Sequence, residues 1–417
     1  MKALKDWIFI QLLFIVANFQ AESINPRNDS KIPSPIILIP GDGGSRAYSN
    51  VDYRIFTTKV LVWVNFEYMV FPSLLRNVFK LEYNTTNHKT SNMKGSDVFF
   101  PGWGDTETIE ELDEKLHIQT TYFSNLVDNL VIDKYYVRNK TVRGAPYDFR
   151  KAPNENQKML DDLKILIEDT YRKSGNERVV ILGHSLGSLY SLYFFKQMTM
   201  SWKKQYIRAF LSVSGPLGGA VKAVTLETSG ESLGSPRSPI YFREMQRSFP
   251  STSFLLPKPE IFGKEPFIIT PTRNYSSYDY EDLFKDMSMP YGSTMYNDTK
   301  NLVDGTETPE GIDELYCIHS YGLPTTKQLT FKAFPDGQPQ FTTGDGDYTV
   351  NIQSLKICEK WKNVNYFTIK GADHMQIVST PEFMLKLKQI LYRQPNGKFP
   401  IIPPRFDGND RIRVQIF

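Results

Sequence analysis

The sequence predicts an α/β fold in which a buried parallel β-sheet is covered by helices on both faces. The first observation is a set of short apolar runs bounded by glycine, proline or polar residues, which is typical of buried strands. The second is that segments with helical periodicity separate these runs. Strands that alternate with helices favour a parallel sheet, because each parallel connection needs a crossover. The predicted strands lie within residues 34–45, 178–185, 209–216 and 364–371.

Each predicted element has a recognisable beginning or end. The run SPIILIPGDGGS, residues 34–45, is a strand that ends in a glycine-rich turn. The segment 154–175 has the periodicity of an amphipathic helix and stops at Gly175. A second helix is expected over 188–198, directly after the strand at 178–185. The apolar face of the first helix would consist of Leu160, Leu163, Ile167 and Tyr171.

The pentapeptide GHSLG, residues 183–187, matches the G-x-S-x-G motif of a nucleophile elbow. Ser185 would stand on a sharp turn between a buried strand and a helix, which is the context that this motif requires. Glycines are needed two residues to either side, because a side chain there would collide with neighbouring backbone. The helix would point its free N–H groups at the site. We therefore expect Ser185 to be a nucleophile.

A nucleophilic serine needs a base, and the chain contains five histidines. Two of them precede the serine, which is the wrong order, and the one next to the serine would point away. His374 lies in a loop after the last predicted strand, where the base is expected. His319 lies beside a cysteine and is expected to be structural. The histidines excluded by order or direction are His88, His117 and His184.

The base needs an orienting acid, and a developing oxyanion needs two backbone N–H donors. The segment FTTGDGDYTVNIQS offers Asp345 and Asp347 between the nucleophile and the base, and position alone does not separate them. One oxyanion donor is expected at Leu186, directly after the nucleophile. The other is expected in the loop after the first strand, at Asp42 or Gly43.

The first residues have the features of a secretory signal peptide. Two lysines precede a largely apolar run over residues 7–17, and cleavage is expected near Ala17 or Ala21. A membrane anchor is disfavoured because the run is shorter than the ~18 apolar residues that a span needs, and no later segment reaches that length. The net charge of +3 does not suggest nucleic-acid binding and would not repel an anionic membrane.

Secretory entry gives meaning to the cysteines and to the glycosylation sequons. Cys317 and Cys358 are the only two cysteines, and we expect one structural disulfide. A metal site is not expected, because two distant thiols lack the spacing of metal ligands. The N-x-S/T sequons, which predict a glycoprotein, lie at Asn28, Asn84, Asn139, Asn274 and Asn297.

Several motifs, standing in the family's order, resemble the lecithin–cholesterol acyltransferase family over about residues 36–392. The resemblance implies an α/β-hydrolase core, a membrane-binding lid subdomain and an inserted cap. With the signal peptide at 1–21, the expected division is core at 31–50, 99–215 and 341–395, lid at 51–98 and cap at 216–340. The tail at 396–417 extends past the family's usual end, is Pro-rich and basic, and is expected to be disordered. The motifs are KTVRGAPYDFRKAPNEN, GHSLGSLYSLYFF, WKKQYIRAFLSVSGPLGG, TPTRNYSSYDY, LYCIHSYGLPT, GDGDYTVN and GADHMQI.

The resemblance also implies roles for individual residues. Ser185 matches the nucleophile and His374 the base. The family's acid is the second aspartate of its GDGD motif, which selects Asp347. Gly43 and Leu186 match the two residues whose N–H groups bind the oxyanion.

The segment 60–79 matches the family's membrane-binding subdomain in position, although its residues alone fit a buried core equally well. Cys317 and Cys358 match the family's second disulfide. The family's lid disulfide is missing, because this chain has no cysteine between residues 48 and 93. The residues expected to bind lipid are Trp63, Phe66, Phe71, Leu74 and Leu75.

Asp42 matches an aspartate that stands beside the oxyanion hole in the lysosomal branch of the family, where the plasma enzyme has a cysteine. An ionised carboxylate there would oppose an oxyanion, whereas a protonated one could donate a hydrogen bond to it. The resemblance therefore implies an enzyme that works in acid. The alternative is that Asp42 only serves a turn.

The function implied is that of a serine hydrolase and acyltransferase that cleaves acyl esters of glycerophospholipids without calcium. The acyl group would pass to water or to a lipid alcohol such as ceramide, at acidic pH in the lysosome. The expected partner is a phospholipid membrane or lipoprotein surface, and no cofactor, metal or obligate protein partner is implied. Two alternatives are a secreted phosphatidylcholine–sterol O-acyltransferase that works at neutral pH and a catalytically silent lipid-binding protein.

Overall fold

A computed structural model describes residues 32–53, 56–113 and 120–403 of the chain. The predicted signal peptide and the sequon at Asn28 lie outside these residues, as do residues 404–417 of the tail. Among the described residues, no helix is both long enough and apolar enough to cross a membrane.

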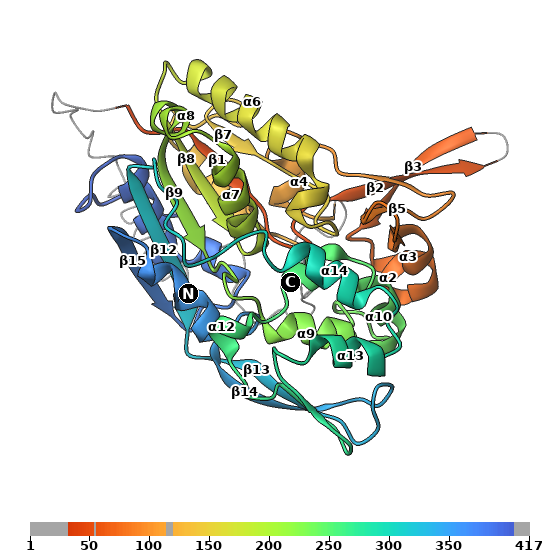
Figure 1. The fold of residues 1–417 in the computed structure, drawn as a ribbon. Helices are drawn as coiled ribbons and strands as arrows, with labels where there is room; N and C mark the ends of the chain where they lie inside the picture. Colours follow the sequence, from red (N-terminus) through yellow and green to blue (C-terminus); the bar gives the residue numbers. More distant parts are fainter. Residues whose placement is uncertain (1–31, 54–55, 114–119, 404–417) are drawn as a thin grey trace, which may run out of the picture. The chain divides into compact units, whose positions relative to one another are not determined.

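Six parallel strands form the main sheet, as the alternation of strands and helices predicted. Their order is β15-β12-β9-β8-β1-β7, so β8 lies between β9 and β1. The carboxyl ends of parallel strands meet at one edge of the sheet, where α/β proteins hold their ligands. The strands are β1 (Ile36–Ile39), β7 (Val142–Gly144), β8 (Val179–His184), β9 (Ile207–Val213), β12 (Glu314–Tyr321) and β15 (Val364–Lys370) (Figure 1).

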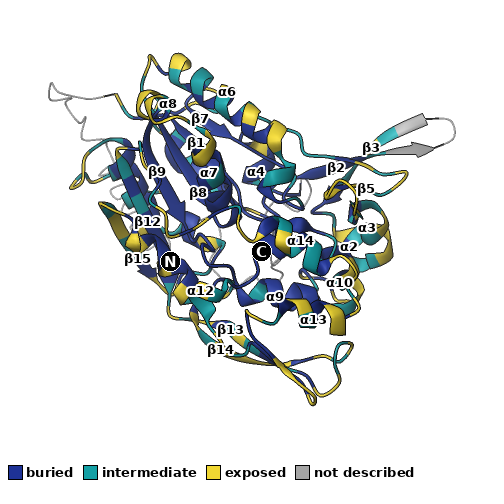
Figure 2. Ribbon diagram, viewed as in Figure 1, coloured by how far each residue is buried: buried dark blue, intermediate teal, exposed yellow. Residues whose placement is uncertain are grey.

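The main sheet separates two hydrophobic cores, because successive side chains of a strand point to opposite faces. On β1, Ile37 and Ile39 enter one core, while Ile36 and Leu38 enter the other. Figure 2 shows the inner strands β1, β8 and β9 as a buried layer and the covering helices with exposed outer faces. Helix α6 (Gln157–Lys173) packs in the first core through the apolar face predicted for it. The other helices of this part are α4 (Glu107–Glu110), α5 (Ser124–Val131), α7 (Leu186–Gln197), α8 (Met200–Tyr206), α15 (Ile352–Leu355) and α16 (Pro381–Leu391).

Residues 47–99, which we call the lid region, form a set of small elements between β1 and β7. A three-stranded antiparallel sheet has β2 in its centre. Asn65 caps the first of two short helices by accepting hydrogen bonds from two backbone N–H groups, and Pro72 opens the second helix. The elements are β2 (Ala47–Tyr53), β3 (Phe56–Trp63), α2 (Phe66–Val70), α3 (Pro72–Phe79), β4 (Leu81–Asn84), β5 (Lys89–Asn92) and β6 (Asp97–Phe99).

Residues 221–299 and 323–346, which we call the cap region, combine short helices with a four-stranded sheet of order β11-β10-β13-β14. The helices are α9 (Val221–Thr228), α10 (Ile240–Gln246), α11 (Pro250–Phe254), α12 (Pro259–Phe262), α13 (Tyr280–Asp286) and α14 (Gly292–Thr299). The strands are β10 (Ile268–Ile269), β11 (Asn274–Tyr275), β13 (Leu323–Thr330) and β14 (Gln340–Gly346).

Two boundaries of the sequence-based division were wrong. β12 falls inside the range 216–340 assigned to the cap, yet it is an internal strand of the main sheet. β14 was largely assigned to the core, yet it pairs with β13 in the cap region. The sequence of β12, ELYCIHSY, mixes polar and apolar residues and so lacks the continuous apolar run of a buried strand.

The beginning of the tail also differs from the expectation of disorder. Residues up to 403 lie against helix α5, because the Asn129 side chain bonds both backbone groups of Ile402, at 2.8 and 3.0 Å. Tyr392 and Phe399 stack with their ring centroids 4.8 Å apart. The tail therefore continues the packed structure for several residues beyond α16.

Candidate active site

Ser185 stands on a strained turn between β8 and α7, with φ 53° and ψ −126°. A Cβ atom on Gly183 would lie 2.7 Å from the carbonyl oxygen of Gly187. A Cβ atom on Gly187 would lie 2.2 Å from the carbonyl oxygen of Ile39. Both positions therefore exclude a side chain, which is the reason predicted for the flanking glycines of a nucleophile elbow.

A buried Asp–His pair lies on the loops that follow β14 and β15. The Nδ1 atom of His374 is 2.8 Å from Oδ2 of Asp347, and both side chains are almost fully buried. The other carboxylate oxygen of Asp347 accepts the N–H groups of Val350, at 2.7 Å, and Thr349, at 3.2 Å. The acid is thus held in place and can orient the imidazole.

The structure distinguishes the two aspartates that position in the sequence could not. Asp345 is exposed, and its carboxylate accepts the N–H of Gly322 at 2.6 Å. Asp347 alone of the two contacts a histidine. This arrangement agrees with the choice of Asp347 made from the family resemblance.

Ser185 Oγ and His374 Nε2 are both buried, and neither has a hydrogen-bond partner among the described residues. Buried polar atoms are rarely left unpaired without a functional reason. Nucleophile–base contacts are often long in unliganded enzymes and tighten when substrate binds. These two atoms are therefore free for the reaction that a serine nucleophile and a base perform.

The loop after β1, residues 40–44, lies directly against the nucleophile. A Cβ atom on Gly41 would lie 2.8 Å from the Cβ atom of Ser185. The loop closes on itself, since the Gly44 N–H donates to the Gly41 carbonyl oxygen at 3.1 Å. Gly43 has φ 71°, a conformation that favours glycine. Of the two predicted oxyanion donors, Gly43 thus belongs to the loop that packs against Ser185, and Leu186 directly follows the nucleophile.

Asp42 is buried in this loop, and burial raises the pKa of its carboxyl group to about 8. A hydrogen bond from the Gly43 N–H acts in the opposite direction and lowers the pKa less. The Oδ1 atom has no hydrogen-bond partner among the described residues. The carboxyl group is therefore neutral in acid and carries a proton beside the place where an oxyanion would form.

Trp63 was predicted to bind lipid at the surface, and this was wrong. Its side chain is 3% exposed, and its indole N–H donates to the Gly43 carbonyl oxygen at 2.7 Å. Leu75 was also wrongly placed at the surface, because it faces inward from α3 with no exposed area. The lid region thus contacts the oxyanion loop through Trp63. No signal in the sequence separates these residues from their exposed neighbours.

The other three residues predicted to bind lipid are exposed, although all are large and apolar. Phe66 is 44% exposed, Phe71 53% and Leu74 48%. They lie on α2, at the junction of the two helices and on α3. Neighbouring apolar side chains that face water mark an interaction surface.

A narrow pocket with a cavity volume of about 30 Å³ lies beside Asp42 and Gly43, between the lid and cap regions. Its wall is mostly apolar and aromatic, with a single ion pair between Lys222 and Glu231 at 2.5 Å. Such a lining suits a hydrocarbon chain. The apolar lining residues are Trp63, Phe79, Phe149, Leu226, Leu233, Met245 and Phe249.

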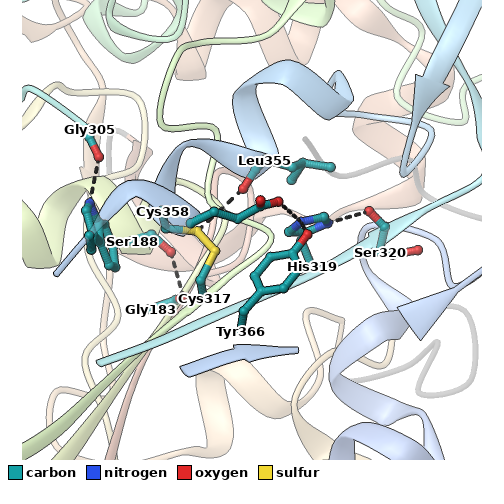
Figure 3. Close-up of a disulfide and its surroundings, with 11 residues drawn as sticks. Gly183, Ser188, Gly305, Cys317, His319, Ser320, Leu355, Cys358 and Tyr366 are labelled. Carbon is teal, nitrogen blue, oxygen red and sulfur yellow. Dashed lines mark hydrogen bonds and ion pairs between the residues drawn. A yellow bond between two sulfur atoms is a disulfide. The ribbon is translucent and has the colours of Figure 1, made fainter. Parts of the chain in front are cut away.

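His319 lies apart from this arrangement, beside the Cys317–Cys358 disulfide that the sequence predicted. Figure 3 shows the disulfide linking β12 to the segment before β15, with His319 and Tyr366 next to it. The His319 ring contacts the Ser320 carbonyl oxygen at 2.9 Å and the Tyr366 hydroxyl at 2.8 Å. Both ring nitrogens are engaged in the fold, in agreement with a structural role.

The remaining predicted surface sites are accessible. All four described sequon asparagines are exposed, so attachment of a glycan meets no obstacle in the fold. No group of three or more metal-ligating side chains occurs among the described residues. The exposed asparagines are Asn84, Asn139, Asn274 and Asn297.

The strand order and the place of Ser185 directly after β8 are those of the α/β-hydrolase fold. A serine on this elbow, close to the loop after β1 and accompanied by an Asp–His pair, defines the class of serine hydrolases and acyltransferases. Residues 56–310 match the family model of lecithin:cholesterol acyltransferase. The chain belongs to this family.

Curated relatives cover most of the chain. The human (Homo sapiens) lysosomal phospholipase A and acyltransferase is 35% identical over 376 residues, which cover 86% of this chain and 90% of that protein. The chicken (Gallus gallus) phosphatidylcholine-sterol acyltransferase is 35% identical over 366 residues, covering 82% and 87%. Among solved structures, a chain of the Tle4–Tli4 complex is similar in fold, with a TM-score of 0.51 and 13% identity over 87% of this chain and 98% of that one.

Proposed function

We propose that this protein is a lysosomal serine phospholipase A and acyltransferase that acts on glycerophospholipids. The observation that carries the proposal is the apolar pocket at Asp42 and Gly43, on the loop that packs against Ser185 through Gly41. An acyl chain that widens this pocket would bring its ester carbonyl to the loop that packs against the nucleophile. The relatives named as lysosomal enzymes support both the substrate class and the compartment.

In the proposed reaction, Ser185 Oγ attacks the ester carbonyl while His374 Nε2 takes its proton. Asp347 accepts the Nδ1–H of His374 and stabilises the imidazolium that forms. The N–H of Leu186 binds the oxyanion of the tetrahedral intermediate, and the N–H of Gly43 joins it by turning from the Asp42 carboxyl group to which it donates in the free enzyme. The proton on His374 then passes to the departing alcohol, which leaves a lysophospholipid and an acyl-enzyme.

The second half of the reaction decides between hydrolysis and transfer. His374 removes a proton from water or from the hydroxyl of a lipid alcohol such as ceramide, and the acceptor oxygen attacks the acyl-enzyme. Breakdown of the second intermediate releases the acyl product, and Ser185 regains its proton from His374. No step calls for a metal or a cofactor.

The proposed lipid surface consists of Phe66, Phe71 and Leu74. These exposed side chains lie on the lid region, whose buried members contact the active-site loop and line the pocket. Insertion of three apolar side chains into a bilayer would bring the pocket mouth to the membrane. The predicted roles of Trp63 and Leu75 at this surface are withdrawn because both are buried.

The proposal is tested by fatty-acid release from calcium-free liposomes of phosphatidylcholine with an acidic lipid, measured from acid to mildly alkaline pH. Ceramide in the same liposomes reports transfer. Wild type should act best in acid, Ser185→Ala should be inactive, and Ser191→Ala should retain activity, since Ser191 bonds only a backbone carbonyl of the same helix. A neutral optimum would replace the proposal by a secreted acyltransferase, and an inactive wild type would replace it by a lipid-binding protein.

A further inference from the structure

A buried series of hydrogen bonds links the oxyanion loop to the backbone of the base, His374. The Gly41 N–H donates to the Tyr122 hydroxyl oxygen at 3.0 Å. The same hydroxyl lies 2.5 Å from Nδ1 of His184, and Nε2 of His184 lies 2.8 Å from the carbonyl oxygen of His374. Tyr122, His184 and His374 are each at most 2% exposed.

The direction of every hydrogen bond in this series follows from its partners. The His374 carbonyl oxygen can only accept, so Nε2 of His184 carries the proton. Burial lowers the pKa of His184 to about 3, with repulsion from His374 acting in the same direction, so the ring is neutral and Nδ1 has a free lone pair. Tyr122 must then donate its O–H to His184 and accept from Gly41. Within residues 32–53, 56–113 and 120–403, these hydrogen-bonding atoms have no other partner.

We infer that Tyr122 and His184 are positioning residues. They fix the loop after β1 and the loop that carries His374 relative to each other, next to Ser185. The inference rests on the proposed function. Gly41 touches the nucleophile side chain, as shown by the 2.8 Å approach of its added Cβ to the Ser185 Cβ, so a shift of Gly41 shifts the oxyanion donor at Gly43. His374 is held at its backbone by His184 and at its ring by Asp347.

The two residues come from different elements, which explains why such a link is needed. His184 ends β8, whereas Tyr122 lies 62 residues earlier in the sequence, just before α5. The oxyanion loop itself carries glycines that allow it to move. A misplacement of about 1 Å near reacting atoms costs about a hundredfold in rate. If the oxyanion loop loses its hydrogen bond to Tyr122, we therefore expect the chemical step to become slower while the apolar pocket stays unchanged.

The test uses Tyr122→Phe, which removes only the hydroxyl, and a short water-soluble ester that needs no membrane. We expect kcat to fall about tenfold to a hundredfold, with KM changed by less than about twofold. Labelling of Ser185 by a fluorophosphonate should slow in parallel. Tyr136→Phe is the matched control, because Tyr136 is equally buried and its hydroxyl donates to the Ser34 carbonyl at 3.0 Å, away from the site.

A double-variant cycle separates positioning from general destabilisation. His184→Gln keeps a donor for the His374 carbonyl but gives Tyr122 no imidazole acceptor, so Tyr122→Phe and His184→Gln break the same link. The double variant should lose little more activity than the more damaged single variant. Fully additive losses, or equal losses in Tyr122→Phe and Tyr136→Phe, would overturn the inference. A wild type that cleaves the soluble ester but not phospholipid would instead overturn the proposed substrate, and one that reacts with neither ester nor fluorophosphonate would overturn both.

Discussion

At the scale of single residues, burial distinguishes Asp347 from Asp345 as the candidate acid of the site. Asp347 is fully buried against His374, whereas Asp345 is exposed two residues earlier. We expect Asp347→Asn to reduce kcat about 10³- to 10⁴-fold, because an amide cannot hold the imidazole in its working tautomer. Asp345→Asn is the control and should retain activity, since its side chain can still accept the Gly322 N–H. Steady-state kinetics on a soluble ester measure both. Equal effects would reassign the acid.

The raised pKa of Asp42 predicts that enzyme activity declines at alkaline pH. Its pKa is raised to about 8 by burial, so the carboxyl group ionises as the pH rises through about 8 and then opposes the oxyanion. Wild-type activity on a soluble ester should decline there, whereas Asp42→Asn, which stays neutral, should remain active. If the pH–rate profiles of the two proteins overlapped, the proposed effect of Asp42 on activity would be wrong and Asp42 would serve only the turn.

Much of the site could be predicted because the elbow and the order of its partners are local in sequence. Ser185 and His374 follow from a motif and from the place of a loop after a strand. The contacts of Tyr122 with Gly41 and of Trp63 with Gly43 could not be found, because the partners lie 81 and 20 residues away. Contacts of this kind depend on packing, and no periodicity in the sequence records them.

At the scale of elements, α2 and α3 divide their apolar residues between the interior and water. On α3, Leu75 and Phe79 are buried while Leu74 is exposed. Changing both Phe71 and Leu74 to serine should weaken binding to anionic liposomes about tenfold or more, because apolar surface is lost from the bilayer contact. Hydrolysis of a soluble ester should be unchanged, since neither side chain lines the pocket. Flotation with liposomes measures the first effect, and unchanged flotation would contradict it.

Trp63 at the end of β3 should behave in the opposite way. Trp63→Phe removes the hydrogen bond to the Gly43 carbonyl but keeps an aromatic ring next to Phe79, whose ring centroid is 6.0 Å away. We expect activity on a soluble ester to fall about tenfold as the oxyanion loop loosens, with liposome binding retained. If Trp63→Phe lost liposome binding but kept full activity on the soluble ester, Trp63 would instead act in membrane binding.

At the scale of the whole molecule, the sequence predicted the core better than its insertions. The strands β1, β8 and β9 are buried along their whole length and are therefore visible as apolar runs. β12 falls within the long range assigned to the cap, and polar residues interrupt its sequence, although the main sheet and the disulfide at Cys317 both hold it in the core. Where an element is buried by neighbours from distant parts of the chain, composition alone does not reveal it.

The cap region carries a second buried carboxyl group that links stability to pH. Burial raises the pKa of Glu227 on α9 to about 8, although Arg247 and the Ser253 hydroxyl act to lower it. Tyr280 also faces it, and Glu227 Oε2 has no hydrogen-bond partner among the described residues. Because the folded pKa lies above the unfolded value of 4.5, the stabilising contribution is fully present below pH 4.5 and is lost as the pH rises through about 8.

The Glu227→Gln variant should therefore have nearly the same free energy of unfolding as wild type in acid. At alkaline pH it should lose less of this free energy than wild type does. The difference between the two proteins should grow to the order of 4 kcal/mol above pH 8, measured by urea unfolding. The buried His184 contributes with the opposite sign, since its pKa is lowered to about 3, but this contribution is common to both proteins and cancels. Glu260→Gln, at an exposed position on α12, is the control and should follow wild type. If Glu227→Gln and wild type lose stability in parallel as pH rises, Glu227 does not adapt the cap to an acidic compartment.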